Sequence, residues 1–279
     1  MYPYALIKIG GEGVLYFYDL LLSVGIIVIM LLADKLTVKS GFSVALQRLV
    51  IICAVAAVVV GYGSAVLFQA FYNYLDNPSA GFHINEEAGA TFLGGLIGGA
   101  ASFLLLYFLI GKKMCKAGEE KKRFGTLADI AAICIPLAHG FGRLGCLMAG
   151  CCHGAETDAW YGIYMQSLGA KVVPLQLFEA LFLFAVAGGM YALFLKNTGK
   201  YKFPLLPAYC AVYGIWRFFL EFARADERGA TIVPFLSPSQ LVSLLMIIGG
   251  GIYLAVWLFK RKKSTNEPME KTPQEEKKD

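Results

Sequence analysis

Long apolar stretches dominate this sequence and restrict it to folds that can pass through a membrane. A helix needs roughly 20 predominantly apolar residues to cross a bilayer. Seven stretches reach about that length: residues 14–33, 44–72, 89–110, 127–149, 174–195, 204–222 and 238–259. With 57% hydrophobic and only 16% charged residues, the chain has more apolar surface than a soluble domain of its size would need. The expected fold class is therefore all-α: a polytopic membrane protein with seven transmembrane helices.

Two local patterns refine these expected helices. The stretch 44–72 is longer than one span, and Gly61-Tyr62-Gly63 is expected to break it into a span and an interfacial segment. Thr126-Leu-Ala-Asp129 follows a capping-box pattern, in which a carboxylate three residues after Thr helps to start a helix. The fourth helix is therefore expected to begin near Thr126.

Basic residues alternate along the chain in a way that predicts orientation. Lys and Arg gather after the first, third, fifth and seventh stretches, as in the run between Lys112 and Arg123. Because such residues favour the cytoplasmic side, the N-terminus is expected outside and the C-terminus in the cytoplasm. Anionic lipid accounts for the net charge of +5, so no nucleic-acid partner is expected. Residues 1–263 are expected to form a single transmembrane domain, with a disordered cytoplasmic tail at 264–279.

One segment places several polar side chains at the end of an apolar stretch. If residues 130–149 are helical, His139, Arg143 and Cys146 share one helix face. A permanent cation inside a membrane-length apolar segment is costly, so Arg143 is a candidate functional residue. Alternatively, Arg143 has only a structural role and pairs with a buried acid such as Glu179 or Glu221.

Polar groups also mark other predicted helices near the outer face. They are Tyr18 in the first, Gln176 and Glu179 in the fifth, and Tyr213, Arg217, Glu221 and Arg224 in the sixth. Two arginines, carboxylates and tyrosines together suggest a membrane cavity for a phospholipid headgroup, because guanidinium groups grip phosphate. Arg217 and Glu221, four residues apart, could instead only support their helix.

The glycines and cysteines carry less specific signals. Gly94, Gly95 and Gly98 permit either close helix packing or backbone contact with a phosphate. Cys146, Cys151, Cys152 and His153 do not have a recognised zinc spacing, and vicinal cysteines rarely both reach one ion. A disulfide on the outer face and simple packing of small side chains are both open.

Several of these residues stand in longer patterns. The most specific is Tyr213-Gly-x-x-Arg217-Phe-x-x-Glu221-Phe-x-Arg224. Four others are Gly142-Arg143-Leu-Gly145 with Gly154, Pro174-x-Gln176-Leu-Phe178-Glu179, Gly94-Gly95-Leu-Ile-Gly98, and Tyr18. Over residues 14–260, in patches, the chain resembles the prolipoprotein diacylglyceryl transferase family of bacterial inner membranes.

This resemblance implies a reaction and its participants. The reaction moves a diacylglyceryl group from phosphatidylglycerol to the lipobox cysteine of a prolipoprotein and releases glycerol phosphate. The implied partners are phosphatidylglycerol, the lipobox segment and membrane lipids, in the bacterial inner membrane and without a cofactor or metal. Arg143, Arg217, His139 and His153 are the expected catalytic residues. The expected substrate contacts are Tyr18, Gly94, Gly95, Gly98, Cys146, Gly154, Gln176, Glu179, Tyr213 and Glu221.

The chain departs from the family at three positions. Leu93 replaces a histidine before the paired glycines, Cys146 replaces an asparagine, and Cys151 lies near the place of a glutamate. Since that histidine is the family's proposed base, His139 or His153 is expected to take its role, because imidazole titrates near neutral pH. Two alternatives stay open: a paralogue with another lipid or acceptor, and a non-enzymatic lipid-binding or thiol-redox membrane protein.

Overall fold

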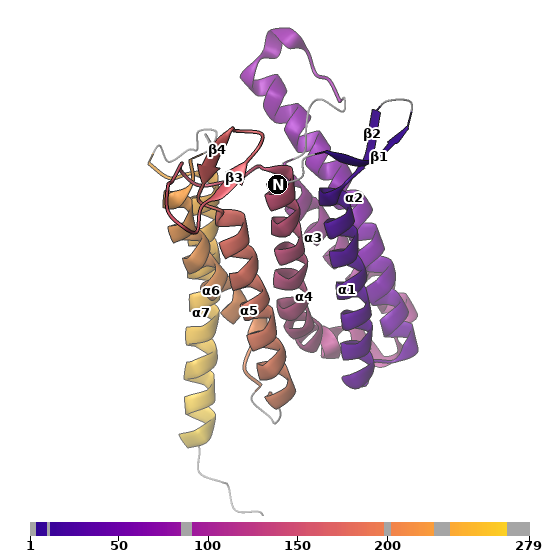
Figure 1. Cartoon of the computed structure of the whole chain (residues 1–279). Helices are drawn as coiled ribbons and strands as arrows, with labels where there is room; N and C mark the ends of the chain where they lie inside the picture. The colour runs from indigo at the N-terminus through magenta and orange to yellow at the C-terminus, as the bar shows by residue number, and fades with distance from the viewer. Residues whose placement is uncertain (1–3, 10–11, 85–90, 198–201, 226–234, 267–279) are drawn as a thin grey trace, which may run out of the picture. The chain divides into compact units, whose positions relative to one another are not determined.

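The computed structural model describes residues 4–9, 12–84, 91–197, 202–225 and 235–266, most of which are helical. Within these ranges the α-helices are α1 (Phe17–Lys39), α2 (Val44–Asp76), α3 (Phe92–Met114), α4 (Glu119–Ala149), α5 (Leu175–Lys196), α6 (Leu205–Leu220) and α7 (Pro238–Asn266) (Figure 1). Three short 3-10 turns accompany them: η1 (Pro78–Ala80), η3 (Lys116–Gly118) and η4 (Glu221–Ala223).

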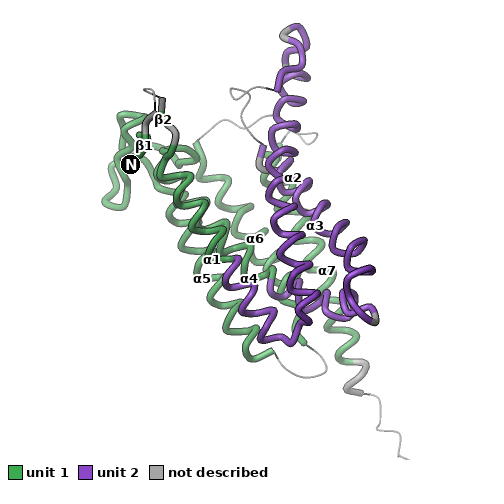
Figure 2. The backbone as a smooth tube through the Cα atoms, turned by 90° about the vertical axis from the view of Figure 1, so that its right-hand side faces the viewer, with its two compact units in different colours: residues 1–29, 131–279 green, residues 30–130 purple. Residues whose placement is uncertain are grey.

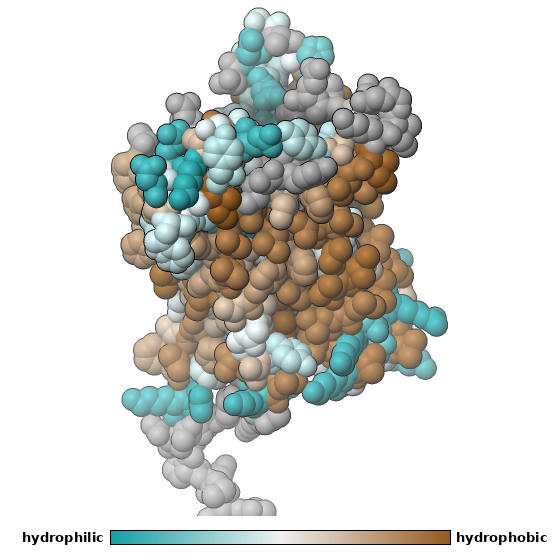
Figure 3. Space-filling view, in the orientation of Figure 1, coloured by the Kyte–Doolittle hydropathy of each residue, from teal (hydrophilic) through white to brown (hydrophobic). Residues whose placement is uncertain are grey.

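Six of the described helices, α1 to α5 and α7, are long and apolar enough to cross a membrane. The helical surface in Figure 3 is correspondingly hydrophobic over most of its middle, with hydrophilic side chains toward the ends. The chain is therefore a multi-pass membrane protein, as expected. The predicted stretch 204–222 forms α6, which has 16 residues, and then tightens into η4. The count of seven spans stays a prediction.

The predicted break in the second helix is wrong, because α2 continues through Gly61-Tyr62-Gly63. Gly61 lies against α3, where an added Cβ would be 3.1 Å from the carbonyl oxygen of Gly95 and 3.4 Å from Cα of Gly99. The missing side chain therefore serves close packing of two helix backbones rather than a bend.

The predicted start of the fourth helix is also wrong. α4 begins at Glu119, and Asp129 lies inside the helix with only 8% of its surface exposed. Glu119 and Glu120 occupy the first turn, where negative charge is favourable next to the exposed backbone N–H groups. Asp129 is consequently not a helix-start carboxylate.

Two small antiparallel hairpins qualify the all-α expectation. β1 (Ala5–Ile9) pairs with β2 (Glu12–Tyr16) directly before α1. β3 (Ile163–Met165) pairs with β4 (Ala170–Val172) between α4 and α5, with Tyr164 opposite Lys171. The sequence patterns predicted neither hairpin, because runs of three to five residues give little periodicity.

The chain divides into two compact units, which Figure 2 colours separately. The first unit comprises residues 1–29 and 131–279, and the second comprises residues 30–130. In the first unit α6 packs against both α5 and α7, and in the second unit α2 packs against α3. The expected tail at 264–279 lies mostly outside the described residues, since α7 reaches Asn266.

Candidate active site

A buried ion pair joins α4 to α5 in the first unit. Nε of Arg143 lies 2.8 Å from Oε2 of Glu179, whose side chain is 1% exposed. The same Nε also donates to Nε2 of His139 at 3.2 Å. His139 and Arg143 are one turn apart on α4, so both side chains meet the same acid, as the predicted shared face requires. Of the two acids considered for Arg143, Glu179 is therefore the partner.

Helix α6 supplies the second arginine. The Tyr213 hydroxyl donates to Oε1 of Glu179 at 2.9 Å, so Glu179 receives groups from both α4 and α6. One turn further along α6, Nη2 of Arg217 lies 2.8 Å from Oε2 of Glu221. Both Arg217 and Glu221 are buried, with 6% and 9% of their surface exposed. A continuous polar cluster therefore runs from Arg143 through Glu179 and Tyr213 toward Arg217.

The start of α7 completes the surroundings of Arg217. Nη2 of Arg217 donates to Oγ of Ser239 at 3.0 Å, and the Ser237 hydroxyl donates to Oε1 of Glu221 at 2.8 Å. Ser237 and Gln240 also form a reciprocal capping box, with bonds of 3.2 Å and 3.0 Å. The sequence reasoning missed both serines, although Ser237-Pro-Ser-Gln240 carries the capping signal that could have located them.

Both guanidinium groups keep unused donors. Nη1 of Arg217 is buried and has no hydrogen-bond partner among the described residues. Arg143 bonds through Nε, and the described part of the chain offers no acceptor to its two terminal nitrogens. A buried donor without an acceptor is unfavourable unless a ligand satisfies it. Arg217 therefore keeps a buried donor that an anionic ligand could satisfy.

The segment after α4 is tied to α5 and η4. The side-chain amide of Gln176 donates to the carbonyl of Cys151, and the Gly154 amide bonds to the Val173 carbonyl at 2.9 Å. An added Cβ at Gly154 would lie 3.0 Å from the Ala223 carbonyl oxygen, which explains the need for glycine there. Nδ1 of His153 lies 2.9 Å from the Gly154 carbonyl. A carbonyl only accepts, so Nδ1 carries the proton and Nε2 presents a lone pair.

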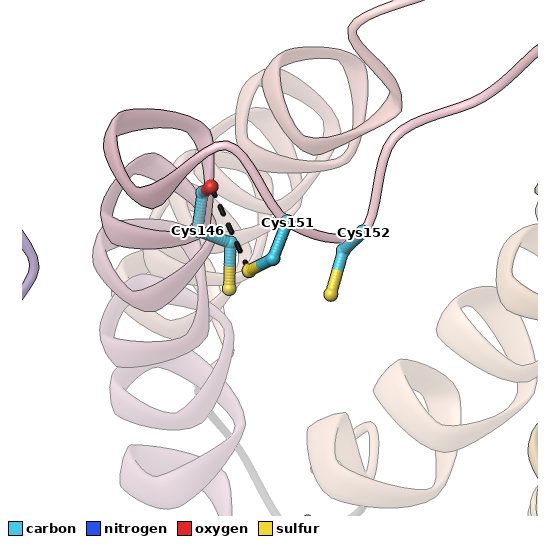
Figure 4. A group of neighbouring side chains, drawn as sticks. All are labelled: Cys146, Cys151 and Cys152. Atoms are coloured by element: carbon cyan, nitrogen blue, oxygen red, sulfur yellow. Dashed lines mark hydrogen bonds between the residues drawn. The ribbon is translucent and has the colours of Figure 1, made fainter. Parts of the chain in front are cut away.

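Three thiols come together at the end of α4. The sulfur atoms of Cys146, Cys151 and Cys152 all lie within 4.8 Å of one another (Figure 4). All three are free thiols. Hydrogen bonds from the Cys146 and Cys151 thiols, together with the guanidinium of Arg224, hold the pKa of Cys152 well below its usual range. Arg224, which follows η4 and closes the Tyr213–Arg224 motif, thus lies beside Cys152.

Other expected site residues occupy different surroundings. The Tyr18 ring packs on α4, where a Cβ at Gly145 would lie 2.9 Å from its Cδ2. Gly94, Gly95 and Gly98 belong to the second unit, and they face α2. There the Ser64 hydroxyl donates to the Gly94 carbonyl at 2.9 Å. Their predicted contact with a lipid phosphate stays a prediction.

Known proteins resemble this chain in sequence. The family profile described as Prolipoprotein diacylglyceryl transferase matches residues 4–257. The chain is 32% identical to phosphatidylglycerol–prolipoprotein diacylglyceryl transferase 2 of Clostridium perfringens, covering 91% of this chain and 95% of that protein. It is 30% identical to the Clostridioides difficile phosphatidylglycerol–prolipoprotein diacylglyceryl transferase, with 88% and 92% covered. The chain belongs to the prolipoprotein diacylglyceryl transferase family.

Proposed function

We propose that Arg143 and Arg217 carry the activity of this family in the protein: transfer of a diacylglyceryl group from phosphatidylglycerol to a prolipoprotein cysteine. The observation that carries this assignment is the unused Nη1 donor of buried Arg217, next to the Glu179 carboxylate cluster that holds Arg143 and Tyr213. A phosphodiester offers anionic oxygens that match the guanidinium geometry. The paired acids hold each guanidinium in place before the lipid arrives.

The reaction requires positively charged donors next to the leaving phosphate. The thiolate of the acceptor cysteine attacks the glyceryl carbon and forms an S–C bond, while the C–O bond to phosphate breaks and glycerol phosphate leaves with the electron pair. Negative charge grows on the departing phosphate, and preorganised donors in a water-poor site stabilise it strongly. Arg143 and Arg217 are the groups that supply these donors.

His153 is the better placed of the two candidate bases. Its Nδ1–H bonds to the Gly154 carbonyl, so Nε2 has the lone pair needed to accept the acceptor thiol's proton. His139 already accepts from Arg143 through Nε2 and would have to break that bond first. We therefore assign proton acceptance to His153 and a positioning role beside Arg143 to His139.

The remaining site residues form the walls around the two arginines. Glu179, Tyr213 and Glu221 orient the guanidinium groups, and Gln176 and Gly154 fix the segment that follows α4. Tyr18 of α1 packs against Gly145 of α4, the neighbour of Cys146, and there Tyr18 and Cys146 would contact lipid or the lipobox.

Membrane placement follows from the distribution of Lys and Arg. With seven spans, an outer N-terminus and a cytoplasmic C-terminus, the end of α4 faces the outer side of the bacterial inner membrane. The lipobox segment of an exported prolipoprotein reaches the site from that side, and phosphatidylglycerol enters from the surrounding lipid. Nucleic acid has no part in this reaction.

A reconstituted assay tests this function. The purified full chain is supplied with phosphatidylglycerol and a lipobox peptide, and the peptide mass is followed. We expect a gain of one diacylglyceryl group, absent with a peptide whose cysteine is serine. His153→Gln should lower turnover more than His139→Gln. Failure to modify the peptide under conditions where a Clostridium relative does so would refute the assignment.

A further inference from the structure

We propose that Cys146, Cys151 and Cys152 form a three-thiolate site for Zn²⁺, whose fourth position binds the thiolate of the acceptor cysteine. The metal site itself rests on the geometry of this chain. The identity of the fourth ligand rests on the proposed function, because it requires a thiol substrate.

The backbone brings the first two thiols together. Gly150, with φ of +77°, ends α4, and the amide of Cys151 bonds to the carbonyl of Cys146 at 3.2 Å. The Gly150 amide bonds to the Leu147 carbonyl at 3.3 Å. These two bonds define a Schellman motif, in which the residue after the glycine contacts the last full turn of the helix. Cys146 and Cys151 occupy those two places.

The third thiol joins them through an unusual backbone conformation. Cys152 has a φ of +66° and is the only non-glycine residue in the described ranges with a positive φ. In extended backbone, adjacent side chains point to opposite sides. The left-handed conformation at Cys152 removes this alternation, and the sulfur atoms of both vicinal cysteines lie within 4.8 Å of that of Cys146 (Figure 4). Vicinal cysteines, which rarely both reach one ion, can therefore do so at this position.

The positions of the three sulfur atoms suit a thiophilic ion that keeps one open coordination position. Zn–S bonds of about 2.3 Å in a tetrahedron separate the sulfur atoms by about 3.8 Å, within the 4.8 Å found here. No fourth Cys, His, Asp or Glu joins this group in the part of the chain that the structure describes. Three protein ligands and an open position are typical of catalytic rather than structural zinc. Arg224 next to Cys152 offsets the single negative charge of three thiolates with Zn²⁺.

The trio also lies next to the proposed reaction centre. Cys146 is three residues beyond Arg143 on α4, so both lie on one helix face. Gln176, which bonds to the carbonyl of Cys151, is likewise three residues before Glu179 on α5. A thiolate held at the open zinc position would therefore be one helical turn from the groups assigned to the phosphate.

Zinc at this place would replace the need for a strong base. The acceptor thiol binds Zn²⁺ as thiolate, and its proton passes to Nε2 of His153 or to water. Sulfur then forms the S–C bond as the C–O bond to phosphate breaks, and the phosphate keeps that electron pair. Zinc does not change its oxidation state in this sequence. Metal binding lowers the pKa of a thiol, so a chain that has leucine at position 93 can still form the nucleophile.

Cobalt(II) is the spectroscopic probe for the site. The reduced full chain in detergent is titrated with Co²⁺, which absorbs strongly in the near ultraviolet when bound by thiolates. We expect saturation at one ion per chain and displacement by Zn²⁺. The band should disappear in Cys146→Ser, Cys151→Ser and Cys152→Ser, and persist in the control variants Cys134→Ser and Cys210→Ser. Lipobox peptide should shift the visible cobalt bands, whereas its Cys→Ser form should not.

The alternatives give different results. Absence of a thiolate band, or its persistence in all three serine variants, overturns the metal site even if peptide lipidation continues. A disulfide among the three cysteines in the intact mass of unreduced protein also overturns it. A cobalt band that the peptide does not shift would support the metal site but would overturn the acceptor thiolate as its fourth ligand. A shift without any lipidated product would instead count against the proposed transferase function.

Discussion

Two helix interfaces, one in each compact unit, are held together by opposite means. In the second unit, α2 and α3 approach through glycine: a Cβ added at Gly99 would be 3.1 Å from the Ala57 carbonyl oxygen. In the first unit, α4, α5 and α6 are joined by charged and hydroxyl groups around Glu179. Both interfaces lie between predominantly apolar helices. They therefore show that membrane helices can be held together with or without buried charge.

This difference distinguishes contacts that only stabilise the fold from polar groups that bind a ligand. Backbone contact between small residues stabilises helix pairs by dispersion and needs no polar group. Buried ion pairs are weak evidence for stability, because removing two charges from water offsets most of their attraction. Their presence in the first unit, with donors left unused, is therefore better explained by a ligand than by folding.

The largest expected effect is that of Arg143→Lys. Lysine keeps a positive charge near Glu179 but loses the planar fork that can bind two phosphate oxygens. We expect turnover to fall by about 10²-fold or more, as for removal of a transition-state donor. Peptide lipidation per mole of folded protein measures it. If turnover stays within threefold of wild type by this assay, Arg143 has a structural role only.

The converse test is in the second unit. Gly99→Leu inserts a side chain between α2 and α3 and should destabilise the protein by about 1–3 kcal/mol. Activity per folded molecule should change little. Gly63→Leu is the matched control, because a Cβ there meets nothing within 4 Å. Thermal unfolding in detergent measures both variants, and equal midpoints would contradict packing through glycine.

Tyr213→Phe removes one hydrogen bond to Glu179 without changing the helix interface. Hydrogen bonds to charged groups contribute about 1.5–3 kcal/mol, so a measurable loss of stability is expected. Because Glu179 also positions Arg143, turnover should fall while KM for phosphatidylglycerol stays nearly constant. A rise in KM alone would instead identify Tyr213 as a direct lipid contact.

The smallest effect is expected for Ser239→Ala. It removes the acceptor for Nη2 of Arg217, which still has Glu221, so a loss of about 1 kcal/mol or a few-fold in rate is expected. Ser102→Ala in α3, which removes a bond to the Gly99 carbonyl, is the matched control. If only Ser239→Ala lowers turnover, the polar interface of the first unit serves the reaction and the α2–α3 interface does not.

The length of the apolar stretches was enough to predict a helical membrane protein and most of its membrane-spanning helices. The ion pair of Arg143 was also predictable as one of two choices, because few buried acids were available. Gly61 was misread, since a glycine in a helix looks the same in sequence whether it breaks the chain or admits a neighbour. The thiol cluster could not be predicted, because it depends on the left-handed conformation of Cys152.

The pairing of each arginine with its own carboxylate has a consequence for lipid exchange. Arg143 with Glu179, and Arg217 with Glu221, form an electroneutral resting set. No mobile counter-ion has to travel into the bilayer when product departs, and none has to be expelled when the next donor arrives. Turnover therefore requires no exchange of ions through the surrounding hydrocarbon, and both arginines remain paired between catalytic cycles.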